Sequence, residues 1–293
     1  MSAPAADAAH SAHRPAAIAE AFCYLQGLVL ERAALALDDG KEYLAEARLG
    51  PLALEAKRSS AWELLLWLRS QPPGELHTAV VEAMTTNETS FFRDPGVFDA
   101  IRDVVIPDLV ARRAAERRLR IWSAACSTGQ ELYSLAMVVR EHGAVLASWD
   151  VRITATDLAT DVLARARAGR FTCLEANRGL AAHRLVRFFT AVGTDLEVAP
   201  ELRALIDFRQ LNLAGPWPLL APVDLVLLRN VLIYFPVPVK RRVLAQVRTV
   251  LRPDGYLILG NAETTFNLDD HFTRVRINKA SAYRLLGSAE GKA

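Results

Sequence analysis

The chain has 293 residues, and 52% of them are apolar, which is enough for one large domain or two smaller ones with a buried core. Its 35 basic and 33 acidic residues leave a formal net charge of +2, so the composition argues against nucleic acid and against an anionic membrane surface as partners of the whole chain. The sequence lacks a continuous apolar run of about 18 residues, so we expect no insertion into a membrane.

The first part of the chain predicts helices. Residues 1–14 are small and polar, and we expect a mobile tail there. From residue 15 to residue 86 the apolar positions follow helical spacing, as in Phe22, Leu25 and Val29, without the alternation of a strand. The segment 15–86 is therefore predicted to form an all-helical domain.

A second domain is predicted over residues 87–287, followed by a short tail at 288–293. After about residue 118, β-rich runs such as VDLVLL and YLILG alternate with helical stretches, which indicates βαβ units and a mainly parallel sheet. Both runs are apolar at successive positions, as strands covered on both faces require. Residues 170–204 interrupt this pattern, and we expect an inserted subdomain between the second and third strands. FTRVRIN and SAYRLL are close in sequence and are expected to pair antiparallel at one edge of the sheet.

Four arginines precede the first predicted strand. They are Arg112, Arg113, Arg117 and Arg118. A solvated helix face is the simplest interpretation of this basic run, and nucleic acid is not expected as a partner.

The cysteines and histidines give no sign of a metal site. Cys23, Cys126 and Cys173 are an odd number without a CxxC pair, which suits a reducing compartment and predicts a cytoplasmic protein with structural thiols. The six histidines are scattered, and none lies at i, i+4 from another, as an intrahelical metal pair requires. We therefore expect no bound metal.

Polar residues follow several predicted strands where parallel strands end together. The junction IWSAACSTGQELYS has small residues that allow a ligand close to the backbone, although taken alone an ordinary tight turn explains it better. Asp157 ends the strand ITATD, where it could accept the hydroxyls of a ribose or cap the next helix. Strands three and four end in QLNL and LLRNVLIYF, so we expect a shared edge. The residues gathered there would be Asn212, Arg229, Asn230 and Tyr234.

Residues 85–94, TTNETSFFRD, complete a set of six motifs in order. The others are IWSAACSTGQELYS, ATD, LNL, LLRNVLIYF and LRPDGYLILGNAET. With this set the chain resembles the chemotaxis-receptor methyltransferase family, CheR, from about Phe22 to Leu286. The resemblance implies an α/β fold: a Rossmann-like, seven-stranded sheet that binds S-adenosylmethionine, an N-terminal helical domain, and a small inserted β-subdomain.

The resemblance also implies roles for individual residues. Asn87, Thr89 and Arg93 would lie beside the cofactor and the reacting carboxylate. Glu131 would lie near the methionine ammonium, and Asp157 on the ribose. The remaining expected site residues are Asn212 and Leu213 at the adenine, and Arg229 and Asn230 along the site.

The implied reaction transfers a methyl group from sulfur to a glutamate side chain, giving a methyl ester and S-adenosylhomocysteine. Glutamate has a pKa of about 4.3, so its carboxylate is already the nucleophile at neutral pH and needs no general base. Arg93 and Tyr234 are the expected catalytic residues, Arg93 orienting the carboxylate and Tyr234 near the transferring methyl. Phe91 and Phe92 are interpreted as packing residues that hold Arg93.

Two departures from the family pattern leave alternatives open. The chain has GQELYS where the family usually has GEEPYS, so Gln130 replaces an acidic residue. The usual arginine-rich helix is reduced to Arg48, Lys57 and Arg58, which predicts weaker docking to a receptor. We expect a monomeric methyltransferase of a chemoreceptor or related signalling protein. A non-catalytic module binding S-adenosylmethionine or another nucleotide, and a methyltransferase with a different substrate, remain alternatives; the missing glycine fingerprint disfavours a nicotinamide oxidoreductase.

Overall fold

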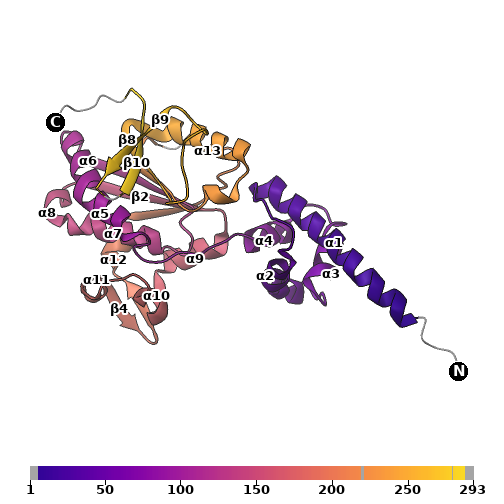
Figure 1. The fold of residues 1–293 in the computed structure, drawn as a ribbon. Coiled ribbons are helices and arrows are strands. Elements are labelled where there is room, and N and C mark those ends of the chain that lie inside the picture. Colours follow the sequence, from indigo (N-terminus) through magenta and orange to yellow (C-terminus); the bar gives the residue numbers. More distant parts are fainter. Residues whose placement is uncertain (1–5, 219–220, 279, 288–293) are drawn as a thin grey trace. The chain divides into compact units, whose positions relative to one another are not determined.

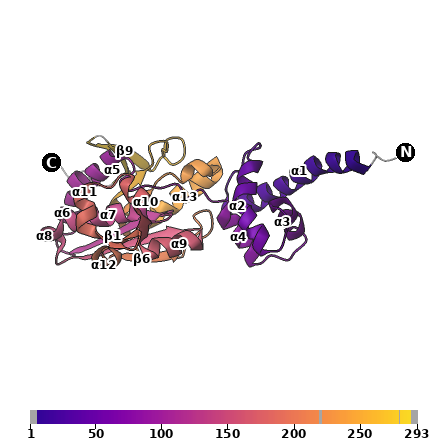
Figure 2. The same cartoon turned by 90° about the horizontal axis from the view of Figure 1, so that it is seen from below.

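The computed structural model describes residues 6–218, 221–278 and 280–287, which fold into two compact units. The first unit extends to Thr86 and includes Tyr234–Pro236. The second contains Asn87–Ile233 and the chain that follows residue 236. Figures 1 and 2 show that helices alone build the body of the first unit, whereas the second surrounds a sheet. In the part of the chain that is described, no helix is both long and apolar enough to cross a bilayer.

The first unit packs four helices around a leucine-rich core. They are α1 (Ala6–Ala33), α2 (Glu42–Glu55), α3 (Ala61–Leu68) and α4 (Glu75–Ala83). Leu25, Leu49 and Leu64 have no exposed surface. Helix α1 begins at Ala6, so residues 6–14 of the predicted tail are helical, as their alanines favour, since alanine is the strongest helix former.

The second unit contains the predicted sheet, in the order β6-β2-β1-β7-β8-β10-β9. Strands β6, β2, β1, β7 and β8 pair parallel, and β10 pairs antiparallel with β8 and with β9. The antiparallel edge pair is confirmed. The strands are β1 (Arg118–Ala124), β2 (Asp150–Asp157), β6 (Ile206–Gln210), β7 (Val223–Leu228), β8 (Leu251–Leu259), β9 (Phe272–Ile277) and β10 (Ala280–Leu285).

Helices lie against both faces of this sheet, because right-handed crossovers that run in opposite directions from β1 and β7 place them on opposite sides (Figure 1). One face carries α7 and α9, and the other carries α13. The helices are α5 (Pro95–Ala100), the π-helical turn η1 (Ile101–Val105), α6 (Ile106–Arg112), α7 (Gln130–Glu141), α8 (Gly143–Leu146), α9 (Thr160–Ala168) and α13 (Val237–Val250).

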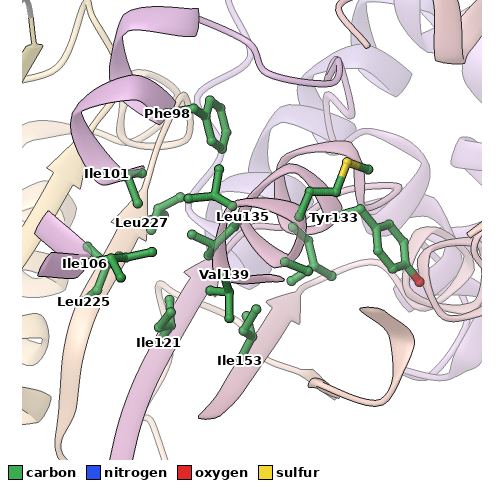
Figure 3. Packing of buried hydrophobic residues seen from close by; sticks show 14 of the residues in the cluster. Phe98, Ile101, Ile106, Ile121, Tyr133, Leu135, Val139, Ile153, Leu225 and Leu227 are labelled. Atoms are coloured by element: carbon green, nitrogen blue, oxygen red, sulfur yellow. The ribbon is translucent and has the colours of Figure 1, made fainter. Parts of the chain in front are cut away.

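The core of the second unit lies between the sheet and α7. Leu135 and Val139 of α7 point toward Ile121, Leu225 and Leu227 on neighbouring strands (Figure 3). All these side chains are buried at 2% exposure or less, and each such side chain contributes about 1.5 to 3 kcal/mol relative to leaving it exposed. This packing fixes the start of α7 relative to the ends of the strands.

The predicted small β-subdomain is inserted between β2 and β6. Its sheet has the order β3-β5-β4, with both pairs antiparallel. It consists of β3 (Arg170–Thr172), α10 (Cys173–Asn177), α11 (Ala182–Phe188), β4 (Phe189–Val192), β5 (Asp195–Val198) and α12 (Pro200–Arg203).

The basic run before β1 is only partly a solvated face. Arg113 is buried and donates from Nε to Asp224 at 2.6 Å and from Nη1 to Asp254 at 2.9 Å. Asp224, which has no exposed surface, also accepts the backbone N–H of Arg120 at 2.8 Å. The interpretation of Arg113 as solvated is therefore wrong, because two carboxylates distant in sequence compensate its charge inside the fold.

Candidate functional site

The loop between β1 and α7 has an unusual backbone. Ala125, Ser127 and Gly129 have φ values of 59°, 51° and 99°, all in the left-handed region. Such residues other than glycine cost about 1 to 3 kcal/mol each and are concentrated at ligand sites, where alternating conformations turn successive N–H groups toward one point. Three residues of this short loop therefore have the backbone conformation that is concentrated at ligand sites.

Asp157 lies beside this loop at the end of β2. Its carboxylate accepts the backbone N–H of Ser127 at 2.8 Å and of Ala159 at 3.1 Å. The Ser127 hydroxyl donates to the carbonyl oxygen of Asn87 at 2.9 Å. Asn87 and Asp157, which are far apart in sequence, are thus brought to the same loop. Burial raises the pKa of the Asp157 carboxyl above its ordinary value, although the hydrogen bonds from backbone N–H groups act in the opposite direction.

Arg229, directly after β7, binds two other segments, and Glu131 joins a third to them. Its Nη1 donates to Glu131 Oε2 at 2.7 Å, and its Nη2 donates to Asp94 Oδ2 at 2.7 Å and to the Arg93 carbonyl oxygen at 3.0 Å. The Arg229 side chain has no exposed surface. Glu131 also accepts from the Ser123 hydroxyl at 3.3 Å. Four segments of the second unit are therefore held by one buried ion network.

The TTNETSFFRD segment is held in a strained conformation around Arg93. Phe92 and Asp94 have φ values of 48° and 62°, and the N–H of Phe92 donates to the Ser134 hydroxyl at 2.9 Å. The half-buried Arg93 donates from Nη1 to the carbonyl oxygen of Glu88 at 3.0 Å. Both neighbours of Arg93 and its own carbonyl are thus fixed by the protein.

The inserted subdomain supports this segment from another side. Phe91 packs edge-on against Phe171 and Phe189, with ring centroids 5.0 and 5.7 Å apart. A Cβ added at Gly179, where φ is 103°, would lie 2.0 Å from the Phe91 carbonyl oxygen, so this close approach requires glycine. Arg178 forms an ion pair with Glu88. The packing role predicted for Phe91 agrees with these contacts.

The remaining expected cofactor residues lie on loops at the same edge of the sheet. The N–H of Leu211 donates to the Asp157 carbonyl at 2.8 Å, which places the LNL turn beside the end of β2. In that turn the Asn212 side chain accepts from Ala214 N–H at 3.0 Å, and Leu213 is buried. Asn230 has a φ of 59°.

Of the last two expected residues, Thr89 lies with Asn87, whereas Tyr234 groups with the first unit. Thr89 lines a cavity of about 340 Å³ together with Asn87, Thr128 and Gln130. Tyr234 ends the short helix η2 (Leu232–Tyr234) and groups with the first unit, where its carbonyl accepts the N–H of Ala36 at 3.2 Å. The catalytic role expected for Tyr234 stays a prediction.

The model of the family described as CheR methyltransferase, SAM binding domain, matches residues 87–281. The chain belongs to the CheR family. Its seven-stranded sheet is accordingly that of S-adenosylmethionine-dependent methyltransferases, as predicted.

Several curated CheR relatives match most of the chain. Chemotaxis protein methyltransferase 1 of Pseudomonas aeruginosa is 41% identical, covering 85% of this chain and 92% of the relative. Chemotaxis protein methyltransferase Cher2 of Pseudomonas putida is 38% identical over 87% and 94% of the two chains. Chemotaxis protein methyltransferase 1 of Vibrio cholerae is 40% identical over 86% and 91%.

Sequence reasoning missed several residues that organise this CheR site. Asp94 and Ser134 hold the motif around Arg93, and Ser127 joins Asn87 to Asp157. All three residues stand inside the motifs TTNETSFFRD and IWSAACSTGQELYS, so their motif membership was the available signal. Within the described residues, no three His, Cys, Asp or Glu side chains gather as a metal ion would require.

The raised pKa of Asp157 predicts a particular pH dependence of stability. A carboxyl with a raised folded pKa binds its proton more tightly in the folded chain, so its contribution to the free energy of unfolding falls as pH rises from about 4 through the folded pKa. Chemical unfolding of the ligand-free protein should therefore show the wild type losing stability relative to Asp157→Asn across this window, with a constant difference at higher pH. A wild type that gained stability relative to the variant would contradict the direction of the shift.

Proposed function

We propose that this CheR protein transfers the methyl group of S-adenosylmethionine to glutamate carboxylates of a chemoreceptor or related signalling protein. One observation carries the proposal: the buried Asp157 and the strained loop 125–129 meet at the strand edge of a chain whose relatives are named chemotaxis protein methyltransferases. The products are a glutamyl methyl ester and S-adenosylhomocysteine.

The chemistry of the Asp157 region fits the cofactor. Asp157 is a buried carboxylate that accepts backbone N–H groups, and the two hydroxyls of a ribose are donors suited to its remaining acceptor capacity. The LNL turn is next to Asp157, which supports Asn212 and Leu213 as adenine neighbours. Asn87 and Thr89 are proposed to lie beside the cofactor.

The ion pair between Glu131 and Arg229 bears on the role of both residues. Glu131 is proposed to attract the methionine ammonium, but its Oε2 already accepts from Arg229. The ammonium would therefore share this carboxylate with a guanidinium. Arg229, whose side chain is fully buried, is proposed to shape the site by holding Glu131 and Asp94, and Asn230 follows it along the rim.

The catalytic step needs alignment more than proton transfer. When bound, the cofactor supplies an electrophilic methyl group on sulfur. A glutamate side chain is ionised at neutral pH and attacks through a carboxylate oxygen without a general base. Alignment of the reacting atoms can contribute about 7 to 11 kcal/mol. Arg93 is proposed to hold the carboxylate, and Tyr234 to lie near the transferring methyl.

The proposed partner is a chemoreceptor, and the few cations of the N-terminal helical domain would attract it only modestly. Of the cations in the receptor-docking region, Arg48 donates to the carbonyls of Met84 and Thr85 at 2.8 and 3.0 Å, and Arg58 lies over the Trp67 ring at 4.4 Å. These internal contacts support weaker charge steering toward an acidic receptor. We further propose that the protein acts in the cytoplasm as a monomer, without nucleic acid as a partner.

A labelling experiment tests the proposed function. The protein is incubated with methyl-labelled S-adenosylmethionine and chemoreceptor cytoplasmic fragments, and the labelled protein is then treated with mild alkali. We expect volatile methanol, because glutamyl esters hydrolyse whereas N-methyl groups do not. Alkali-stable label would indicate a different acceptor atom, and cofactor binding without transfer would indicate a non-catalytic module.

The cofactor affinity should depend on Asp157. Asp157→Asn removes the charged acceptor for the ribose hydroxyls and should cost about 1.5 to 3 kcal/mol, which is roughly tenfold to more than a hundredfold in Kd by calorimetry. Asp161→Ala is a matched control, because it removes an exposed carboxylate from the start of the adjacent helix. Equal affinity in wild type and Asp157→Asn would remove Asp157 from the site.

Loss of the Arg93 side chain should lower turnover more than it weakens cofactor binding. Arg93→Ala removes the group proposed to orient the substrate carboxylate, so kcat should fall by about 10²-fold, the cost of a misplaced reacting group. Arg276→Ala, an exposed arginine on β9, serves as the control for loss of one positive charge. Unchanged kcat in Arg93→Ala would refute this role.

A further inference from the structure

The loop that follows β7 is bound by a single buried carboxylate, that of Glu263. Glu263 Oε2 accepts the backbone N–H groups of Asn230 and Gly260, each at 2.7 Å. Oε1 accepts those of Val231 at 2.9 Å and Ile233 at 3.3 Å. The residue is 9% exposed. Four backbone donors from two loops thus converge on one side chain.

We propose that Glu263 is a positioning residue that sets the shape of the loop 229–233 for methyl transfer. This inference rests on the proposed function. Hydrogen bonds from N–H groups to an ionised carboxylate are about twice as strong as neutral ones, so they can fix a short irregular loop. Three of the four donors belong to consecutive or nearly consecutive residues of that loop, which leaves its backbone little freedom.

The residues at both ends of the loop show what this shape controls. At its start, the Arg229 side chain holds Asp94 and Glu131, and Asn230 adopts a left-handed conformation. At its end the chain enters η2, which carries Tyr234. A shift of the loop backbone would therefore move Arg229 and the ion network that binds the Arg93 carbonyl.

The neighbouring glycine provides independent support. A Cβ added at Gly260 would lie 2.7 Å from Glu263 Oε2 and 2.8 Å from Asn230 Nδ2. Both distances are shorter than ordinary contacts allow. Gly260 therefore leaves the space in which the carboxylate meets the loop, and replacing it perturbs the same contacts without removing the charge of Glu263.

The test compares three variants of the full chain. Glu263→Gln keeps the shape, but its amide has one acceptor oxygen, so one pair of N–H groups faces an NH₂ group. Gly260→Ala displaces the carboxylate. Asp224→Asn is the stability control, because it weakens the buried contacts to Arg113 and to the Arg120 N–H at the opposite end of β7.

Each variant is assayed for folding by circular dichroism, for S-adenosylmethionine Kd by calorimetry, and for kcat with the receptor fragment, well below its unfolding temperature. We expect kcat to fall by about 10²-fold in Glu263→Gln and at least about tenfold in Gly260→Ala, since loop displacements of about 1 Å have effects of this size. Cofactor Kd should change by a smaller factor than kcat, and Asp224→Asn should keep the kcat of the wild type.

The outcomes separate this inference from the proposed function. If turnover per folded molecule is unchanged in both loop variants while the wild type is active, Glu263 has only a stabilising role and the inference is wrong. If Glu263→Gln fails to fold, Gly260→Ala and Glu263→Asp test the inference in its place. In these variants too, kcat should fall by a larger factor than the cofactor Kd changes. A wild type that transfers no alkali-labile methyl overturns the proposed function and this inference together.

Discussion

The arrangement of the CheR site depends on the burial of one guanidinium, that of Arg229. An arginine without exposed surface costs several kcal/mol in lost hydration unless its charge is compensated, and here Glu131 and Asp94 both do so at 2.7 Å. The three residues come from the loop after β7, from α7 and from the TTNETSFFRD segment. Because removing one partner of such a pair typically costs about 3 to 5 kcal/mol, these segments have little freedom to move independently.

This constraint holds the backbone around Arg93 in a conformation that is locally unfavourable. The backbone around Arg93 has left-handed residues on both sides, and each such residue costs about 1 to 3 kcal/mol unless its surroundings enforce it. The carbonyl of Arg93 is bound by Arg229, and Phe92 N–H by Ser134. The strain is therefore maintained by contacts that a flexible loop would lack. A guanidinium held in this way can orient a carboxylate with little further loss of entropy.

Local sequence patterns predicted the sheet, its antiparallel edge and the inserted subdomain, because strand burial and periodicity are short-range properties. They also predicted that Asp157 and the LNL turn meet, since parallel strands end at one edge. Pairings over long sequence separations were not predictable in this way. Arg113 was interpreted as solvated, although it pairs with Asp224. Glu263 appeared only as part of the motif LRPDGYLILGNAET, because nothing local reveals its four backbone donors.

Two carboxylates near one loop differ in what compensates their charge, and this difference supports the roles proposed for them. Glu131 is paired with Arg229 and is therefore occupied by the protein, whereas Asp157 accepts backbone N–H groups and carries a raised pKa because of burial. A ligand with hydroxyl donors would compensate the buried charge of Asp157 more than that of Glu131. Gln130 fits the same scheme: its side-chain oxygen accepts from the Thr128 hydroxyl at 2.8 Å, so the loop keeps a hydrogen bond at this position without a third negative charge beside Asp157 and Glu131.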